Sequence, residues 1–107
     1  MNTFQKGSIF CFTDSIAYTE AGIVSRQVMK NEKGNVSLFA FAKGEALSEH
    51  TAPFDALVQI IEGEALIIIG GEPFGLKSGD SIIMPANISH AVQAVEKFKM
   101  ILTMIKA

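Results

Sequence analysis

The chain has 107 residues, of which 49% are hydrophobic and 19% are charged, and its formal net charge is −2. This length predicts a single domain over residues 1–107 with one core, and the apolar content excludes a disordered chain. The weakly acidic net charge argues against binding to nucleic acid, which requires a basic surface. No apolar run is long enough to predict a membrane span. The single cysteine, Cys11, has no partner for an internal disulfide, and the first residues lack the apolar stretch of a signal peptide. We therefore expect a cytoplasmic protein.

The first thirty residues predict two short strands separated by irregular chain. Residues 7–12 are interpreted as a short strand, residues 13–22 as a turn or one loose helical segment, and residues 23–29 as an imperfect strand. The polar residues 31–34 end in a glycine, which can take a left-handed conformation. The pattern therefore predicts a hairpin here.

The next predicted strand, residues 36–42, carries apolar side chains on both faces. Leu38 and the alanines beyond it lie on one face, and Phe39 and Phe41 lie on the other. Such a strand must be covered both by a barrel interior and by something outside. Three of the eight phenylalanines also lie in the first dozen residues, where chains are usually loosely held. We therefore predict a homodimer with residues 1–30 in its contacts.

The second half of the chain predicts short strands separated by glycine turns. Two strands are expected to meet at Glu62-Gly63, and Gly70-Gly71 predicts a two-residue hairpin turn. About ten short strands without a sustained helical period predict an all-β sandwich or barrel. The strands expected in this half are residues 56–61, 64–69, 73–77, 81–84, 89–95 and 98–105.

Both histidines of the chain lie in stretches framed by glycine and proline. The first stretch, residues 44–63, begins and ends with glycine and contains His50. The second, residues 79–94, begins with glycine and places His90 five residues after Pro85. These two stretches resemble the two motifs of the cupin family. The resemblance implies a double-stranded β-helix jelly roll, the cupin barrel, and it narrows the all-β prediction accordingly.

Alanines occupy three further positions of the cupin motifs, and the resemblance implies that the first two of these are metal-ligand positions. In this register the second histidine of the first motif falls on Ala52, its glutamate falls on Ala56, and the asparagine of the second motif falls on Ala94. Asn87 replaces a motif glycine and can still serve a left-handed turn. Two of the four metal ligands implied by the resemblance therefore remain.

Side chains alternate faces along a strand, so the motif register directs both histidines into the barrel. We expect the two imidazoles to face each other across the interior and to be the polar groups of a mostly apolar ligand pocket. The predicted lining is His50, His90, Ala52, Ala56, Val58, Ile60, Met84, Val92 and Ala94.

Three functions remain open at this point. The first is binding of a small ligand between His50 and His90 without a tight metal.

The second is an enzyme. One form, implied by the resemblance, is a metal-dependent cupin of the dioxygenase or isomerase type, in which these histidines and a further donor hold zinc, iron, manganese, nickel or copper. The other form is a metal-free enzyme similar to the cupin sugar epimerases, with an interior histidine as general base. A carboxylate usually orients such a base, whereas Glu49 and Asp55 face away by alternation. The third function is a structural or partner-binding domain.

Overall fold

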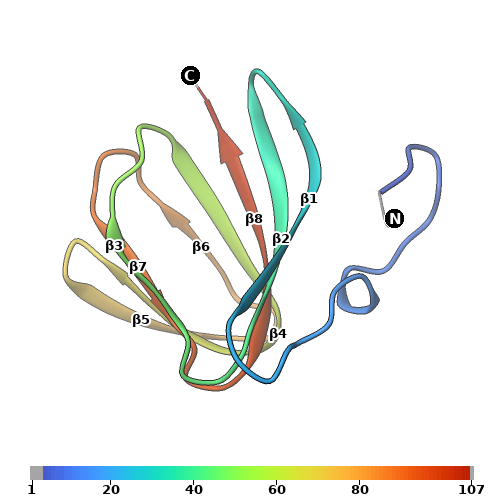
Figure 1. The fold of residues 1–107 in the computed structure, drawn as a ribbon. Helices are drawn as coiled ribbons and strands as arrows, with labels where there is room; N and C mark the ends of the chain where they lie inside the picture. The colour runs from blue at the N-terminus through green and yellow to red at the C-terminus, as the bar shows by residue number, and fades with distance from the viewer. Residues whose placement is uncertain (1–3, 107) are drawn as a thin grey trace.

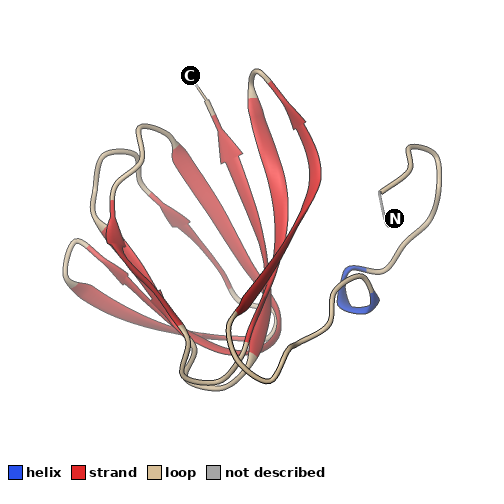
Figure 2. Cartoon of the chain, in the orientation of Figure 1, coloured by secondary structure: helices blue, strands red, loops and turns tan. Residues whose placement is uncertain are grey.

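The computed structural model describes residues 4–106, and within them the regular structure is almost entirely β-strand (Figure 1 and Figure 2). The strands form one curled antiparallel sheet in the order β1-β2-β8-β4-β7-β3, and β5 and β6 also pair with β4. The predicted all-β class is confirmed. The elements are η1 Phe12–Asp14, β1 Ile23–Asn31, β2 Gly34–Phe41, β3 Ala46–His50, β4 Asp55–Ile69, β5 Glu72–Lys77, β6 Ser81–Met84, β7 His90–Gln93 and β8 Phe98–Ile105.

The long strand β4 joins the two walls of this half-barrel. Its first part pairs with β6 and β8, and its second part pairs with β5 and β7 (Figure 1). The pairing with β8 shifts register between Ile60 and Glu62, and Gly63 has a φ of 84°. A Cβ on Gly63 would lie 2.0 Å from the carbonyl oxygen of Lys97. The expected break into two strands at this point is therefore wrong, because a bulge and a glycine let one strand bend and continue.

The predicted hairpins are present. Asn31 pairs with Gly34 where β1 turns into β2. Gly70 and Gly71, with φ values of 57° and 84°, connect β4 to β5. A tight two-residue hairpin turn of this type requires positive φ at both central residues. Paired glycines adopt these values without steric cost.

The main core lies inside the curl of the sheet. Phe41 and Phe98 stack there with ring centroids 4.4 Å apart, and both are fully buried. Val58, Ile60 and Met100 belong to the same buried cluster. These residues alternate with outward-facing neighbours, as expected for strands that bury one face against an interior.

A second apolar cluster covers the outer face of β2 and β8. Leu38 and Ala40 pack there with Ile101 of β8 and with Ile16 from the segment before β1. The doubly apolar character of β2 is therefore confirmed. Part of the outer cover comes from this chain's own N-terminal segment.

The expected strand at residues 7–12 is wrong. That segment follows a turn at Lys6 and Gly7 and runs into η1, and it pairs with no strand among the described residues. Figure 1 shows the segment, in blue, running outside β1 on the side away from the barrel interior. Its aromatic side chains contact one another, with Phe4 and Phe10 at 4.7 Å and Phe10 and Phe12 at 5.1 Å between ring centroids.

Candidate functional site

The two histidines are direct partners on neighbouring strands. His50 ends β3, His90 begins β7, and the two residues pair across the ladder after a shift in register. His90 is only 6% exposed, whereas His50 is exposed. The expectation that the imidazoles face each other across the interior is therefore corrected, because they lie side by side on one wall.

The ring nitrogens of the two histidines converge. The Nε2 atoms of His50 and His90 are 3.1 Å apart, and the ring centroids are 4.3 Å apart. The other ring nitrogen of each histidine contacts the backbone carbonyl two residues earlier: His50 Nδ1 lies 2.8 Å from the oxygen of Ser48, and His90 Nδ1 lies 3.3 Å from that of Ile88. Sequence reasoning missed these two carbonyls, because only the backbone geometry of the bulged pair brings them into reach.

These carbonyl contacts assign the tautomers. A carbonyl oxygen only accepts hydrogen bonds, so each Nδ1 must carry the hydrogen that it donates. In a neutral imidazole the other nitrogen then has a free lone pair. The lone pairs of two Nε2 atoms therefore point toward the same small region. A proton, a metal ion or the donor group of a ligand is the kind of partner that satisfies both.

Burial favours the neutral form of His90. Desolvation lowers the pKa of His90 below its usual value of 6.5, and the charge of His50 lowers that pKa further. The hydrogen bond to the carbonyl of Ile88 opposes the shift. A neutral His90 retains the lone pair that a bound group requires.

Two loops fix the strand ends that carry the histidines. The backbone N–H of Asn87 donates to the carbonyl of Ala52 at 2.8 Å, and the N–H of Ala86 donates to the Asp55 carboxylate at 2.8 Å. Asn87 has a φ of 65°, which confirms the left-handed turn expected there. These bonds tie the chain after β3 to the chain after β6. Asp55 is thereby engaged with a backbone N–H and orients neither imidazole.

The other predicted lining residues lie in the main core or beside the histidine loops. Ala52 is partly exposed. The remaining six are at most 5% exposed and belong to one packed cluster, so they form core behind the histidines. Three hollows on the described surface are lined by other residues, and neither histidine contributes to them. The six core residues are Ala56, Val58, Ile60, Met84, Val92 and Ala94.

The histidine pair supplies two metal-ligating groups. Two nitrogen–metal bonds of about 2.0–2.1 Å can meet at one ion when the nitrogens are 3.1 Å apart. Metal-ligating histidines commonly donate their other ring N–H to a backbone carbonyl, which fixes the orientation of the ring. Among residues 4–106, however, no group of three or more histidine, cysteine, aspartate or glutamate side chains comes together. The residues present thus supply two of the ligands that a metal ion needs, and the other donor atoms would have to come from water or from a bound ligand.

A family model for the cupin domain matches residues 37–106. This chain belongs to the cupin family. The match includes both histidines and every strand from β3 onward. Cupins often bind metals. In this chain, however, alanines stand at 52 and 56, where the cupin motifs have metal ligands, and alanine supplies no donor atom.

Solved cupin structures share the fold over nearly the whole chain. A conserved protein of unknown function from Streptococcus pyogenes has a TM-score of 0.93 and 31% identity, with 99% of this chain and 93% of that chain covered. A cupin superfamily protein from Desulfitobacterium hafniense has a TM-score of 0.91 and 26% identity, with 99% and 97% covered.

A cupin 2 conserved barrel domain protein from Leptotrichia buccalis is also similar. It has a TM-score of 0.85 and 40% identity, and the alignment covers 88% of this chain and 46% of that longer one. No curated protein matches this chain significantly. Within the part of the chain that the structure describes, no helix has the length and apolar character needed to cross a membrane.

Proposed function

We propose that this cupin binds a small ligand at the end of its barrel through the Nε2 atoms of His50 and His90. The observation that carries the proposal is the 3.1 Å convergence of two ring nitrogens whose partner nitrogens both donate to backbone carbonyls. Two convergent acceptors beside an apolar core suit a ligand with an apolar body and a hydroxyl or amino hydrogen. The cytoplasm is the proposed location, supported by the free thiol of Cys11.

The test uses pairs of small molecules that differ only in the donor hydrogen. Phenols and alcohols are titrated into the protein beside their methyl ethers, and binding is followed by calorimetry. We expect the donors to bind more tightly than the ethers, because only a donor satisfies the lone pairs of the imidazoles. His50→Ala and His90→Gln should remove this preference, whereas Gln93→Ala, an exposed change on β7, should preserve it. Equal binding of donors and ethers would contradict the proposal.

The second candidate is a metal-dependent cupin enzyme of the dioxygenase or isomerase type. The separation of the Nε2 atoms, which suits two ligands of one ion, favours it. When bound, a divalent ion would supply Lewis acidity to a ligand at this position. His50 and His90 would hold it, and their carbonyl partners would keep the rings oriented.

Metal analysis separates the two candidates. The protein is purified without an affinity tag, and its content of zinc, iron, manganese, nickel and copper is measured. Near-stoichiometric metal that is lost in a His50→Ala, His90→Ala double variant would favour the metal-dependent function. With only two protein ligands we expect weak binding that dialysis against a chelator removes. Retention of metal in the double variant would exclude the histidine pair as the metal site.

A further inference from the structure

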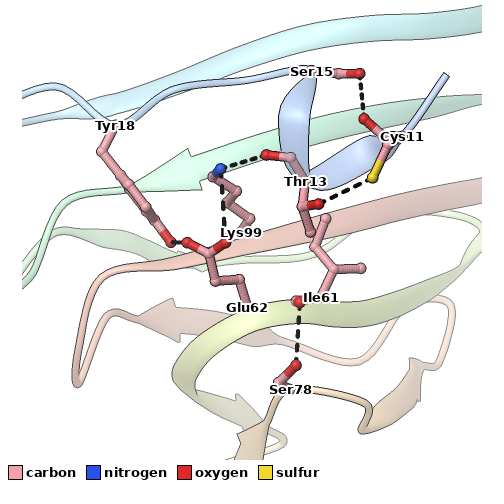
Figure 3. Close-up of polar contacts among 8 residues, drawn as sticks. All are labelled: Cys11, Thr13, Ser15, Tyr18, Ile61, Glu62, Ser78 and Lys99. Carbon is pink, nitrogen blue, oxygen red and sulfur yellow. Dashed lines mark hydrogen bonds and ion pairs between the residues drawn. The ribbon is translucent and has the colours of Figure 1, made fainter.

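One buried polar atom on β2 has no hydrogen-bond partner. Among residues 4–106, the Oδ1 atom of Asn35 is the only buried side-chain nitrogen or oxygen of which this is true. Lys99 shows the usual situation: it is only 7% exposed, donates to the carbonyl of Thr13 at 2.6 Å and lies 3.8 Å from the Glu62 carboxylate (Figure 3). Burying an acceptor without a partner costs free energy, so the Asn35 oxygen requires a partner that the chain itself does not supply.

Asn35 faces the interior of the barrel. It pairs with Met104 of β8, and Met104 packs against the inner core cluster. The next residue along the strand, Val36, packs in the outer cluster. Paired residues of antiparallel strands share a face, and consecutive residues alternate between faces. The side chain of Asn35 therefore lies on the concave face of the sheet.

A row of paired residues runs from Asn35 across this wall. Asn35 pairs with Met104, Met104 pairs with Ala56, and Ala56 pairs with Met84. The row is thus polar at β2 and apolar from β8 to β6. Figure 1 shows that the start of β2, the end of β3 and the start of β7 lie at the same open end of the half-barrel, with β2 on one wall and the other two strands on the opposite wall. Polar groups therefore stand on both walls, with apolar side chains between them.

We propose that Asn35 is the second polar contact of the ligand that His50 and His90 bind, and that this ligand carries a hydrogen-bond donor at each end of an apolar body. The inference rests on the proposed function. The Nε2 atoms accept a donor hydrogen at one end of the ligand, and Oδ1 of Asn35, which is also an acceptor, takes a donor hydrogen from the other end. The methionine and alanine side chains of the row suit the apolar body. The ligand class is a diol or an amino alcohol.

Space reaches the polar end of the row. Lys30, Asn35 and Met104 line a hollow of about 250 Å³, together with residues of the β1–β2 turn and of the outer face. Lys30 pairs with Asn35 on one side, and Met104 pairs with it on the other. Both neighbours have long, unbranched side chains, which can move aside when a ligand reaches the buried oxygen.

A binding role and a structural role of Asn35 predict opposite effects on stability. Asn35→Leu replaces the amide with an apolar group of nearly the same size. If Asn35 serves the ligand, the unliganded variant should unfold at the same temperature as the wild type or at a higher one, because an unpaired buried acceptor has been removed. A lower unfolding temperature would show that the amide has a partner within the folded chain, and it would overturn the proposal.

Calorimetry with phenols that carry a para-hydroxyalkyl chain tests the second contact. The chain length is increased stepwise, and each alcohol is compared with the methyl ether of its alkyl hydroxyl. The wild type should bind at least one alcohol about fivefold more tightly than its ether, which is the effect of one ordinary hydrogen bond. Asn35→Leu should bind the alcohol and the ether equally. Thr103→Val, which removes a hydroxyl beside Met104 on the outer face, should keep the preference.

The outcomes separate this inference from the proposed function. A wild-type protein that prefers phenols to their methyl ethers, but prefers the alkyl alcohol at no chain length, would overturn the role of Asn35 and leave the histidine site standing. The absence of both preferences would overturn both proposals. An undiminished preference for the alcohol in Asn35→Leu would also overturn the role of Asn35.

Discussion

Tyr18 donates a hydrogen bond to Glu62 across a sequence separation of 44 residues, at a distance of 2.6 Å. The bond connects the N-terminal segment to the middle of β4, the strand that joins both walls of the barrel. The burial of Tyr18 and the neighbouring Glu62 raise the pKa of its phenol above the usual value. Tyr18 is therefore a neutral donor to a charged acceptor throughout the physiological range.

Replacing Tyr18 by phenylalanine removes this bond and keeps the ring. We expect the free energy of unfolding to fall by about 1 kcal/mol, because the bond is only partly buried and its acceptor can be solvated. Amide exchange in residues 12–18 should accelerate. Urea denaturation and hydrogen exchange measure the two effects. Thr19→Ala is the control, since Thr19 bonds only to the nearby carbonyl of Ala21, and a loss as large as that of Tyr18→Phe would contradict the role of the bond to Glu62.

The two glycines Gly63 and Gly71 have the same φ of 84° but different surroundings. A Cβ on Gly71 meets nothing within 4 Å, whereas one on Gly63 would overlap the backbone of Lys97 and Phe98. Gly71→Ala should therefore cost only the strain of a left-handed alanine, about 1–2 kcal/mol. Gly63→Ala should cost clearly more, because β8 must also move. Denaturant midpoints compare the variants, and equal losses would refute the steric explanation of the β4 bend.

His90 makes stability depend on pH. Its pKa in the folded state is lowered from 6.5, mainly by burial. As the pH falls below about 6.5, the unfolded chain binds a proton that folded His90 binds only at lower pH. The free energy of unfolding should therefore decrease with falling pH, beginning near the unfolded pKa and continuing to the lowered folded pKa.

Thermal unfolding of metal-free protein between roughly pH 7.5 and 5.5 measures this dependence, in a range where carboxylates contribute little. The His90→Gln variant should lose the part of the slope that His90 contributes. An identical slope in the wild type and the variant would show that His90 is not held neutral by the fold.

Much of the fold follows from local signals in the sequence. Gly70-Gly71 defined a tight turn because few other residues adopt two successive positive φ values. The period-two pattern of β2 indicated two buried faces. The bend in β4 was missed because Gly63 reads as a turn in sequence, and only the close approach of Lys97 explains why the strand continues. The segment 7–12 was misread because Phe12 packs against the outer face of the sheet without joining it, and Ile9 and Phe10 are exposed.

The candidate site was predictable in part. The glycine-framed motifs and strand alternation directed His50 and His90 into the barrel, and the pairing of β3 with β7 brings the two residues together. Alternation alone did not show that the two strands are neighbours, so the expected arrangement across the interior was wrong. The carbonyls of Ser48 and Ile88 carry no side-chain signal. Their role depends on backbone geometry.

The protonation of the two imidazoles tests the proposed site most directly. A long-range proton–nitrogen correlation spectrum of uniformly ¹⁵N-labelled protein, recorded at mildly alkaline pH, distinguishes the two tautomers of each histidine. The account predicts hydrogen on Nδ1 of both His50 and His90, donated to the carbonyls of Ser48 and Ile88. It also predicts that zinc or a donor ligand shifts both Nε2 signals together. Hydrogen on Nε2 of either residue, or a bound group that shifts only one ring, would contradict the claim that the two nitrogens form one binding site.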